Sequence, residues 1–77
     1  MVDTGWIYTT ADGYRGGERR IGGVLLAWYD YDVCDYVGWH VTVIGGSMLD
    51  ESTQGQAATP EQAEAAAVAA LVAWTDE

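Results

Sequence analysis

The chain of 77 residues contains no lysine, and its three arginines face twelve acidic side chains, so the formal net charge is −9. This balance argues against direct binding of nucleic acid. A single cysteine excludes an internal disulfide, and Cys34 with His40 supplies at most half of a zinc site. A run of about eighteen apolar residues is missing, as is the pattern of a signal peptide. We therefore expect a cytoplasmic protein without membrane partner, metal or cofactor.

The composition favours a folded protein, because 49% of the residues are hydrophobic and 12% are aromatic. The length allows one domain, which we place over residues 1–77. Aromatic and β-branched residues dominate the first sixty per cent of the chain, and Asp12-Gly13 is a strong hairpin signal. The predicted strands cover about 5–11, 14–20, 24–31 and 36–44.

The register of the last two predicted strands follows from a turn at residues 32–35. One face then pairs Trp28 with Trp39, Leu26 with Val41, and Val24 with Val43. The other face pairs Leu25 with Thr42, Ala27 with His40, Tyr29 with Gly38, and Tyr31 with Tyr36. A slip by one residue would mix the apolar face with the polar one, so the alternation favours this register.

A helix is predicted over about 60–74, after a polar loop at 47–58. Thr59 is the predicted N-cap, Pro60 is the first helical residue, and Gln62 completes a capping box. The stripe expected to face the sheet contains Ala63, Ala67, Ala70, Leu71 and Trp74. The predicted fold is α+β, a three- or four-stranded antiparallel meander with one C-terminal helix packed on one face.

The opposite side of this helix is also apolar, which is typical of a helix buried on more than one side. The residues concerned are Ala65, Val68, Ala69 and Val72. They are candidates for self-association. The alternative is an exposed alanine-rich surface without a binding role.

Aromatic and acidic residues alternate around the predicted turn at 32–35. We name Tyr29, Asp30, Tyr31, Asp32, Asp35 and Tyr36 the acidic-aromatic strip. Tyrosines give large contact areas and carboxylates attract cationic groups, so the strip is a candidate docking surface for a basic protein. The alternative is a hairpin stabilised by tyrosines, with aspartates that only keep its tip soluble.

The sequence contains no pattern of catalytic residues. His40 has no serine or cysteine nucleophile placed beside it, and the three aspartates of the strip lack the spacing of a calcium loop. No glycine pair opens a phosphate-binding helix. The arginines at 15, 19 and 20 are expected to pair with nearby carboxylates. An enzyme is not predicted.

Residues 55–71, a loop with glycine followed by an alanine-rich helix, resemble the end of double-stranded-RNA-binding domains. Glu61, Gln62 and Glu64 stand where those domains have lysines, and their N-terminal helix is missing, so the resemblance implies shared packing rather than RNA binding. The same stretch, with the strand at 39–43, resembles small uncharacterised proteins of phages that infect actinobacteria. This second resemblance implies a protein made in an infected bacterium to bind a molecule there.

Two functions are therefore expected from the sequence. The first is a small acidic, non-catalytic binding module of phage origin that engages or inhibits a host protein with a basic surface through the acidic-aromatic strip. The second is a homo-oligomeric structural or assembly subunit that associates through the C-terminal helix.

Overall fold

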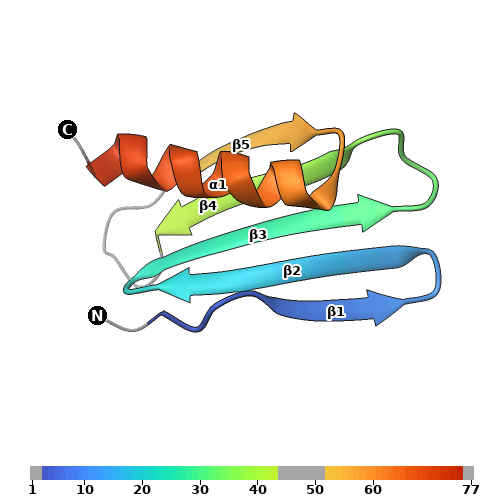
Figure 1. Cartoon of the computed structure of the whole chain (residues 1–77), viewed down its shortest axis with the longest axis horizontal. Helices are drawn as coiled ribbons and strands as arrows, with labels where there is room; N and C mark the ends of the chain where they lie inside the picture. Colours follow the sequence, from blue (N-terminus) through green and yellow to red (C-terminus); the bar gives the residue numbers. More distant parts are fainter. Residues whose placement is uncertain (1–2, 44–51, 76–77) are drawn as a thin grey trace.

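The computed structural model describes residues 3–43 and 52–75, which form a five-stranded antiparallel sheet and one helix (Figure 1). The elements are β1 (Ile7–Ala11), β2 (Tyr14–Ile21), β3 (Val24–Tyr31), β4 (Val37–Val43), β5 (Ser52–Ala57) and α1 (Pro60–Thr75). Each strand pairs with its neighbours in sequence, so the strand order is β1-β2-β3-β4-β5. Helix α1 packs across β3, β4 and β5 on one face. The predicted α+β meander with a covering helix is confirmed, and the sheet has one strand more than the four expected.

The first two strand connections are turns of two residues. Gly13 follows Asp12 with a φ of 74°, and Gly22 begins the next turn with a φ of 60°. These left-handed conformations suit tight hairpin turns and are easily adopted by glycine. The pair Gly22-Gly23 thus forms the hairpin turn between Ile21 and Val24. The first strand begins at Ile7, two residues later than predicted.

The register predicted for β3 and β4 is confirmed. Trp28 lies opposite Trp39, and Leu26 lies opposite Val41, with both pairs on the face that α1 covers. The pairing ends at Asp30 and Val37, so the predicted pair of Tyr31 and Tyr36 does not belong to the ladder. Strand β4 therefore starts one residue later than expected, because the chain is still bending at Tyr36.

Strand β5 corrects the prediction of a loop at 47–58. It pairs antiparallel with β4 from Val37 opposite Ala57 to Thr42 opposite Ser52. Its sequence, STQGQA, has no aromatic residue and one β-branched residue, Thr53, so pairing with β4 rather than intrinsic propensity defines it. Gly55 is needed there, because a Cβ atom would lie 2.6 Å from the indole of Trp39. Residues 47–51 of the predicted loop lie outside the described residues.

The core lies between α1 and the central strands. One cluster contains Leu26, Val41 and Ala67, and the other contains Trp28, Val37 and Ala63. The two alanines are fully buried, which brings the helix backbone close to the sheet. Of the predicted stripe, Ala70 and Leu71 also pack against the first cluster, and the side chain of Trp74 lies outside the described residues.

The indoles of Trp28 and Trp39, which face α1, are held differently. Nε1 of Trp28 donates a hydrogen bond of 2.9 Å to the carboxylate of Glu64, which joins β3 directly to α1. Nε1 of Trp39 is buried and has no hydrogen-bond partner among the described residues. Trp28 is therefore the stronger link between helix and sheet.

The predicted N-cap at Thr59 is confirmed, whereas the Gln62 side chain bonds to the N–H of Ala58 and not to that of Thr59, which a capping box requires. The backbone N–H of Gln62 donates to the Thr59 hydroxyl at 3.1 Å, and Gln62 Oε1 accepts from the N–H of Ala58 at 3.2 Å. These bonds give partners to the N–H groups of Ala58 and Gln62, which have none within the helix. The helix ends at Thr75, one residue beyond the predicted bound.

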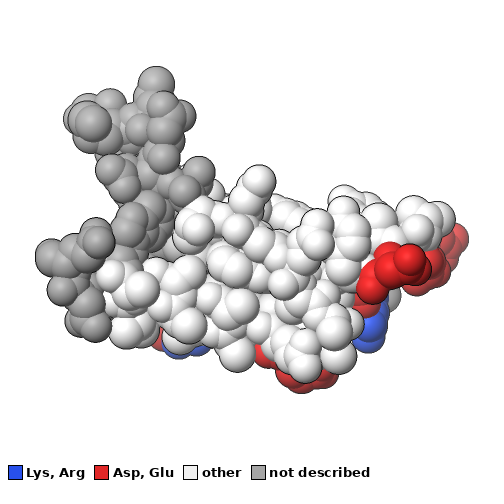
Figure 2. Space-filling model, turned by 90° about the horizontal axis from the view of Figure 1, so that it is seen from above, with Lys and Arg blue, Asp and Glu red and all other residues white. Residues whose placement is uncertain are grey.

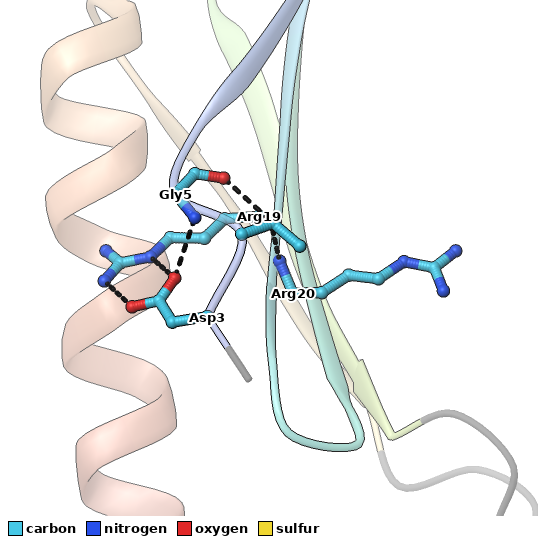
Figure 3. A network of polar contacts seen from close by, with 5 residues as sticks. Asp3, Gly5, Arg19 and Arg20 are labelled. Atoms are coloured by element: carbon cyan, nitrogen blue, oxygen red, sulfur yellow. Dashed lines mark hydrogen bonds and ion pairs between the residues drawn. The ribbon is translucent and has the colours of Figure 1, made fainter. Parts of the chain in front are cut away.

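The segment before β1 is tied to β2 by a polar network (Figure 3). The Asp3 carboxylate accepts hydrogen bonds from Nε of Arg19 at 3.0 Å and from Nη2 at 2.6 Å, and it also accepts the Gly5 N–H at 2.9 Å. Arg19 and then Gly5 lower the pKa of Asp3 to about 2. Arg19 extends toward α1, whereas Arg20 extends to the other side of the sheet.

Candidate functional site

The candidate site lies on the sheet face opposite α1, which we call the open face. Because side chains alternate along each strand, the register places them there in rows across the strands. The described members of the three relevant rows are Ala11, Tyr14 and Tyr31; Thr9, Gly16, Tyr29, Gly38 and Gln56; and Ile7, Glu18, Ala27, His40 and Gln54. The open face thus combines aromatic rings, carboxamides and one imidazole.

Tyr29 and His40 form the centre of the open face. The Tyr29 hydroxyl and Nδ1 of His40 lie 3.0 Å apart and share a hydrogen bond. Burial lowers the pKa of the His40 imidazole, and the charge of Glu18 opposes this shift in part. Burial also raises the pKa of the Tyr29 hydroxyl. Both side chains are therefore uncharged at neutral pH.

Three further tyrosines surround this centre. The rings of Tyr14 and Tyr31 have centroids 4.9 Å apart, and Tyr14 lies over Gly16, where a Cβ atom would displace the Tyr14 ring. Tyr31 and Tyr36 are 46% and 45% exposed, which is high for large aromatic side chains. These two rings are therefore available for contacts with another molecule.

A shallow hollow of about 550 Å³ lies over Gly38. It is lined by Tyr29, Tyr36, Gly38, Trp39, His40, Gln54, Gly55 and Gln56. A smaller hollow of about 230 Å³ adjoins it, with Tyr31 and Cys34 in its lining. Among the described residues, no charged side chain lines either hollow.

The residues of the acidic-aromatic strip lie on both faces of the sheet and in the turn after β3. Tyr29 and Tyr31 lie on the open face, and Tyr36 lines the hollow beside them. Asp32 and Asp35 are exposed in the turn that follows β3. Asp30 instead points to the helix side, where it forms an ion pair of 2.5 Å with Arg15. The six residues therefore do not share one surface, because strand alternation separates Asp30 from the tyrosines.

The sequence did not identify two residues of the open face. Gln54 and Gln56 were placed in a loop, although their spacing around Gly55 follows the alternation of a strand. The predicted register places His40 and Gly38 on the correct face. The bond of His40 to Tyr29 was not foreseen, since the two residues belong to adjacent rows.

The candidate residues for self-association occupy different environments. Ala65 and Ala69 are exposed, and Val72 is 52% exposed. Val68 is half-buried and packs against the cluster of Leu26, Val41 and Ala67. Val68 thus contributes to the core, and the exposed apolar area on α1 is smaller than the sequence indicated.

The three arginines and Cys34 do not line the hollow over Gly38. Arg15 pairs with Asp30 and Arg19 pairs with Asp3, as predicted, whereas Arg20 has no ion pair with a described residue. Cys34 is a half-buried free thiol.

In residues 3–43 and 52–75, no group of three His, Cys, Asp or Glu side chains is arranged to hold a metal ion. The helix found in this part of the chain is not long and apolar enough to cross a bilayer.

Comparison with protein-family models, curated proteins and solved structures gives no match to this chain. The resemblances to phage proteins and to double-stranded-RNA-binding domains therefore stay predictions. Any assignment of function depends on the open face itself.

The environment of His40 predicts a pH dependence of stability. Its folded pKa lies below the ordinary value of 6.5, so the unfolded chain binds more protons as the pH falls below that value. The free energy of unfolding is therefore expected to be highest above about pH 6.5 and to decrease toward about pH 5. Urea unfolding at several pH values in this range measures the slope.

Two variants make this measurement specific. His40→Gln is expected to flatten the slope, because the chain has one histidine. Tyr29→Phe keeps the ring that covers the imidazole and is expected to retain most of the slope, since burial is the main cause of the shift. An equal slope in wild type and His40→Gln would contradict the assignment.

Proposed function

We propose that this chain is a small non-catalytic module that binds a protein partner through the open face and the turn after β3. The observation that carries the proposal is an uncharged aromatic hollow next to exposed aspartates. Tyr31 and Tyr36 offer large, partly exposed rings, and Asp32 and Asp35 lie in the adjoining turn. Rigid aromatic anchors with charged groups around them are typical of protein-binding surfaces.

The charge of the chain favours a basic partner. The formal net charge is −9. Among the described residues, one group of acidic side chains lies at the end of the molecule opposite the described termini, and others lie along the lower edge of the view in Figure 2. Such a field accelerates encounter with a positively charged surface, and the tyrosines would then slow dissociation. The resemblance to phage proteins favours a host protein in the bacterial cytoplasm as this partner, and occupation of its basic site would inhibit it.

The polar centre of the open face favours binding over catalysis. His40 is hydrogen-bonded to a phenol whose pKa is raised, so Tyr29 is a poor nucleophile at neutral pH. No serine or cysteine hydrogen bond to His40 occurs within the described residues. A neutral His-Tyr pair instead supplies a fixed, partly buried hydrogen-bonding surface.

Capture from a bacterial lysate tests the proposal. Wild type is expected to retain a partner that a Tyr31→Ala/Tyr36→Ala variant binds at least about tenfold more weakly, as expected for aromatic anchor residues. An Asp32→Asn/Asp35→Asn variant is expected to show slower association and a weaker dependence on salt. Both dissociation constants are measured with the captured partner once it is purified.

Val72→Glu is the matched control, because it changes an exposed position on the opposite side of the molecule. It is expected to leave capture unchanged. Loss of capture in Val72→Glu alone would place the interface on α1 and would favour the assembly function. Capture that is insensitive to the tyrosine and aspartate variants and to salt would refute binding through the open face.

A further inference from the structure

We propose that the hollow over Gly38 binds the guanidinium group of an arginine side chain that the partner presents. This inference rests on the proposed function and names the chemical group that the open face recognises. Its basis is the shape of the hollow, the arrangement of rings over glycines elsewhere in the sheet, and the charge around the hollow.

The sheet covers its other strand glycines with planar side chains. The indole of Trp28 lies over Gly17, the indole of Trp39 lies over Gly55, and the phenol of Tyr14 lies over Gly16. At Gly38, by contrast, a Cβ atom would meet no described atom within 4 Å. Gly38 is thus the one described strand glycine without a planar group above it.

Gly16 and Gly38 flank Tyr29 in the same row, so they offer comparable sites on its two sides. Tyr14 fills the site over Gly16. The site over Gly38 lies between Tyr29 and Tyr36 and is open to solvent. A planar group from another molecule can enter it and contact both rings.

The charge around the hollow selects a cation. Burial keeps Tyr29 and His40 uncharged at neutral pH, and tyrosine rings attract cations to their faces. Gln54 and Gln56 are exposed, and their side chains form no hydrogen bond with the described residues, so their carboxamide oxygens can accept hydrogen bonds. The carboxylate of Glu18 lies in the next row, and the net charge of −9 disfavours an anion.

Arginine meets these conditions better than lysine does. Its guanidinium is planar, carries five N–H donors and stacks on aromatic rings, whereas an ammonium is a compact, strongly hydrated charge. A guanidinium over Gly38 would stack on the tyrosines and donate to the carboxamides of β5. The hollow therefore fits an arginine of a basic protein segment.

A titration with short peptides tests this inference without the partner. The probes are acetyl-glycyl-arginyl-glycine amide and the same peptide with citrulline, which has nearly the same shape but no charge. The arginine peptide is expected to shift the NMR signals of Gly38, His40 and the Gln54 and Gln56 side-chain amides. Its affinity is expected to exceed that of the citrulline peptide by about tenfold, as a cation–π contact and charged hydrogen bonds predict.

Gly38→Val places a branched side chain where the guanidinium would lie, and it is expected to abolish these shifts while the chain stays folded, because the added atoms start in open space. Glu61→Gln removes an exposed charge in the first turn of α1, on the other face of the sheet, and is expected to weaken binding less than threefold. Equal affinities of the two peptides, shifts confined to the turn after β3, or full binding by Gly38→Val would each overturn the inference.

The two proposals fail in different ways. If the peptide does not bind but capture of a partner depends on Tyr31 and Tyr36, the arginine site alone is wrong. If the arginine peptide binds in the hollow but capture is insensitive to the open-face variants, the proposed function is wrong.

Discussion

Replacing Trp28 with alanine is expected to lower the free energy of unfolding by about 3–5 kcal/mol, the usual cost of deleting a buried tryptophan. Trp28 is 4% exposed, packs with Val37 and Ala63, and covers Gly17. Its indole N–H also donates to Glu64 on α1. The substitution therefore removes packing against the sheet and against α1, and it removes the hydrogen bond between β3 and α1.

This loss is large for so short a chain. At roughly 0.05–0.15 kcal/mol per residue, 77 residues give a total stability of about 4–12 kcal/mol. Urea unfolding followed by circular dichroism measures the change. Trp28→Phe keeps a ring but loses the N–H donor, and it is expected to cost less than Trp28→Ala. A loss below about 1 kcal/mol in Trp28→Ala would contradict the packing of α1 on this side of the sheet.

Valine substitutions at Gly17 and Gly38 are expected to have opposite effects. At Gly17 a Cβ atom would lie 2.4 Å from Nε1 of Trp28, so valine must displace the indole. Overpacking of this kind costs about 1–3 kcal/mol. At Gly38 the space is open, and valine favours a strand more than glycine does, so a gain of about 0.5–1 kcal/mol is expected.

Each variant is the control for the other, because both replace a strand glycine of the same sheet with valine. The difference between the midpoints of urea unfolding reports the environment of each glycine. A Gly38→Val variant as unstable as Gly17→Val would mean that the site over Gly38 is filled in solution. Because Gly38→Val is expected to be more stable than wild type, loss of peptide binding by this variant would not be due to unfolding.

Much of the fold follows from local patterns in the sequence. The alternation in residues 24–31 and 36–44 predicted the register of β3 and β4, because a slip would exchange the two faces. Asp12-Gly13 predicted a hairpin, and Thr59 with Gln62 predicted the start of α1. Strand β5 was missed because its small polar residues become a strand only through pairing with β4 and contact with Trp39.

The candidate site was predicted less completely than the fold. The tyrosines were identified, but the hollow depends on Gly38 being uncovered and on Gln54 and Gln56 lying beside it, which needs β5. Asp30 was grouped with the tyrosines because it is their neighbour in the chain. The predicted register already placed it on the opposite face, so alternation was the better guide.

The off-centre position of α1 has a consequence for how the sheet opens. The helix contacts β3, β4 and β5, whereas every residue of β1 is exposed and this strand has one neighbour, β2. Backbone amides of β1 should therefore exchange with deuterium through local fraying, while those of β3 exchange only when the whole domain unfolds. Opening would spread inward from this edge, so the strands that carry the hollow are among the last to separate.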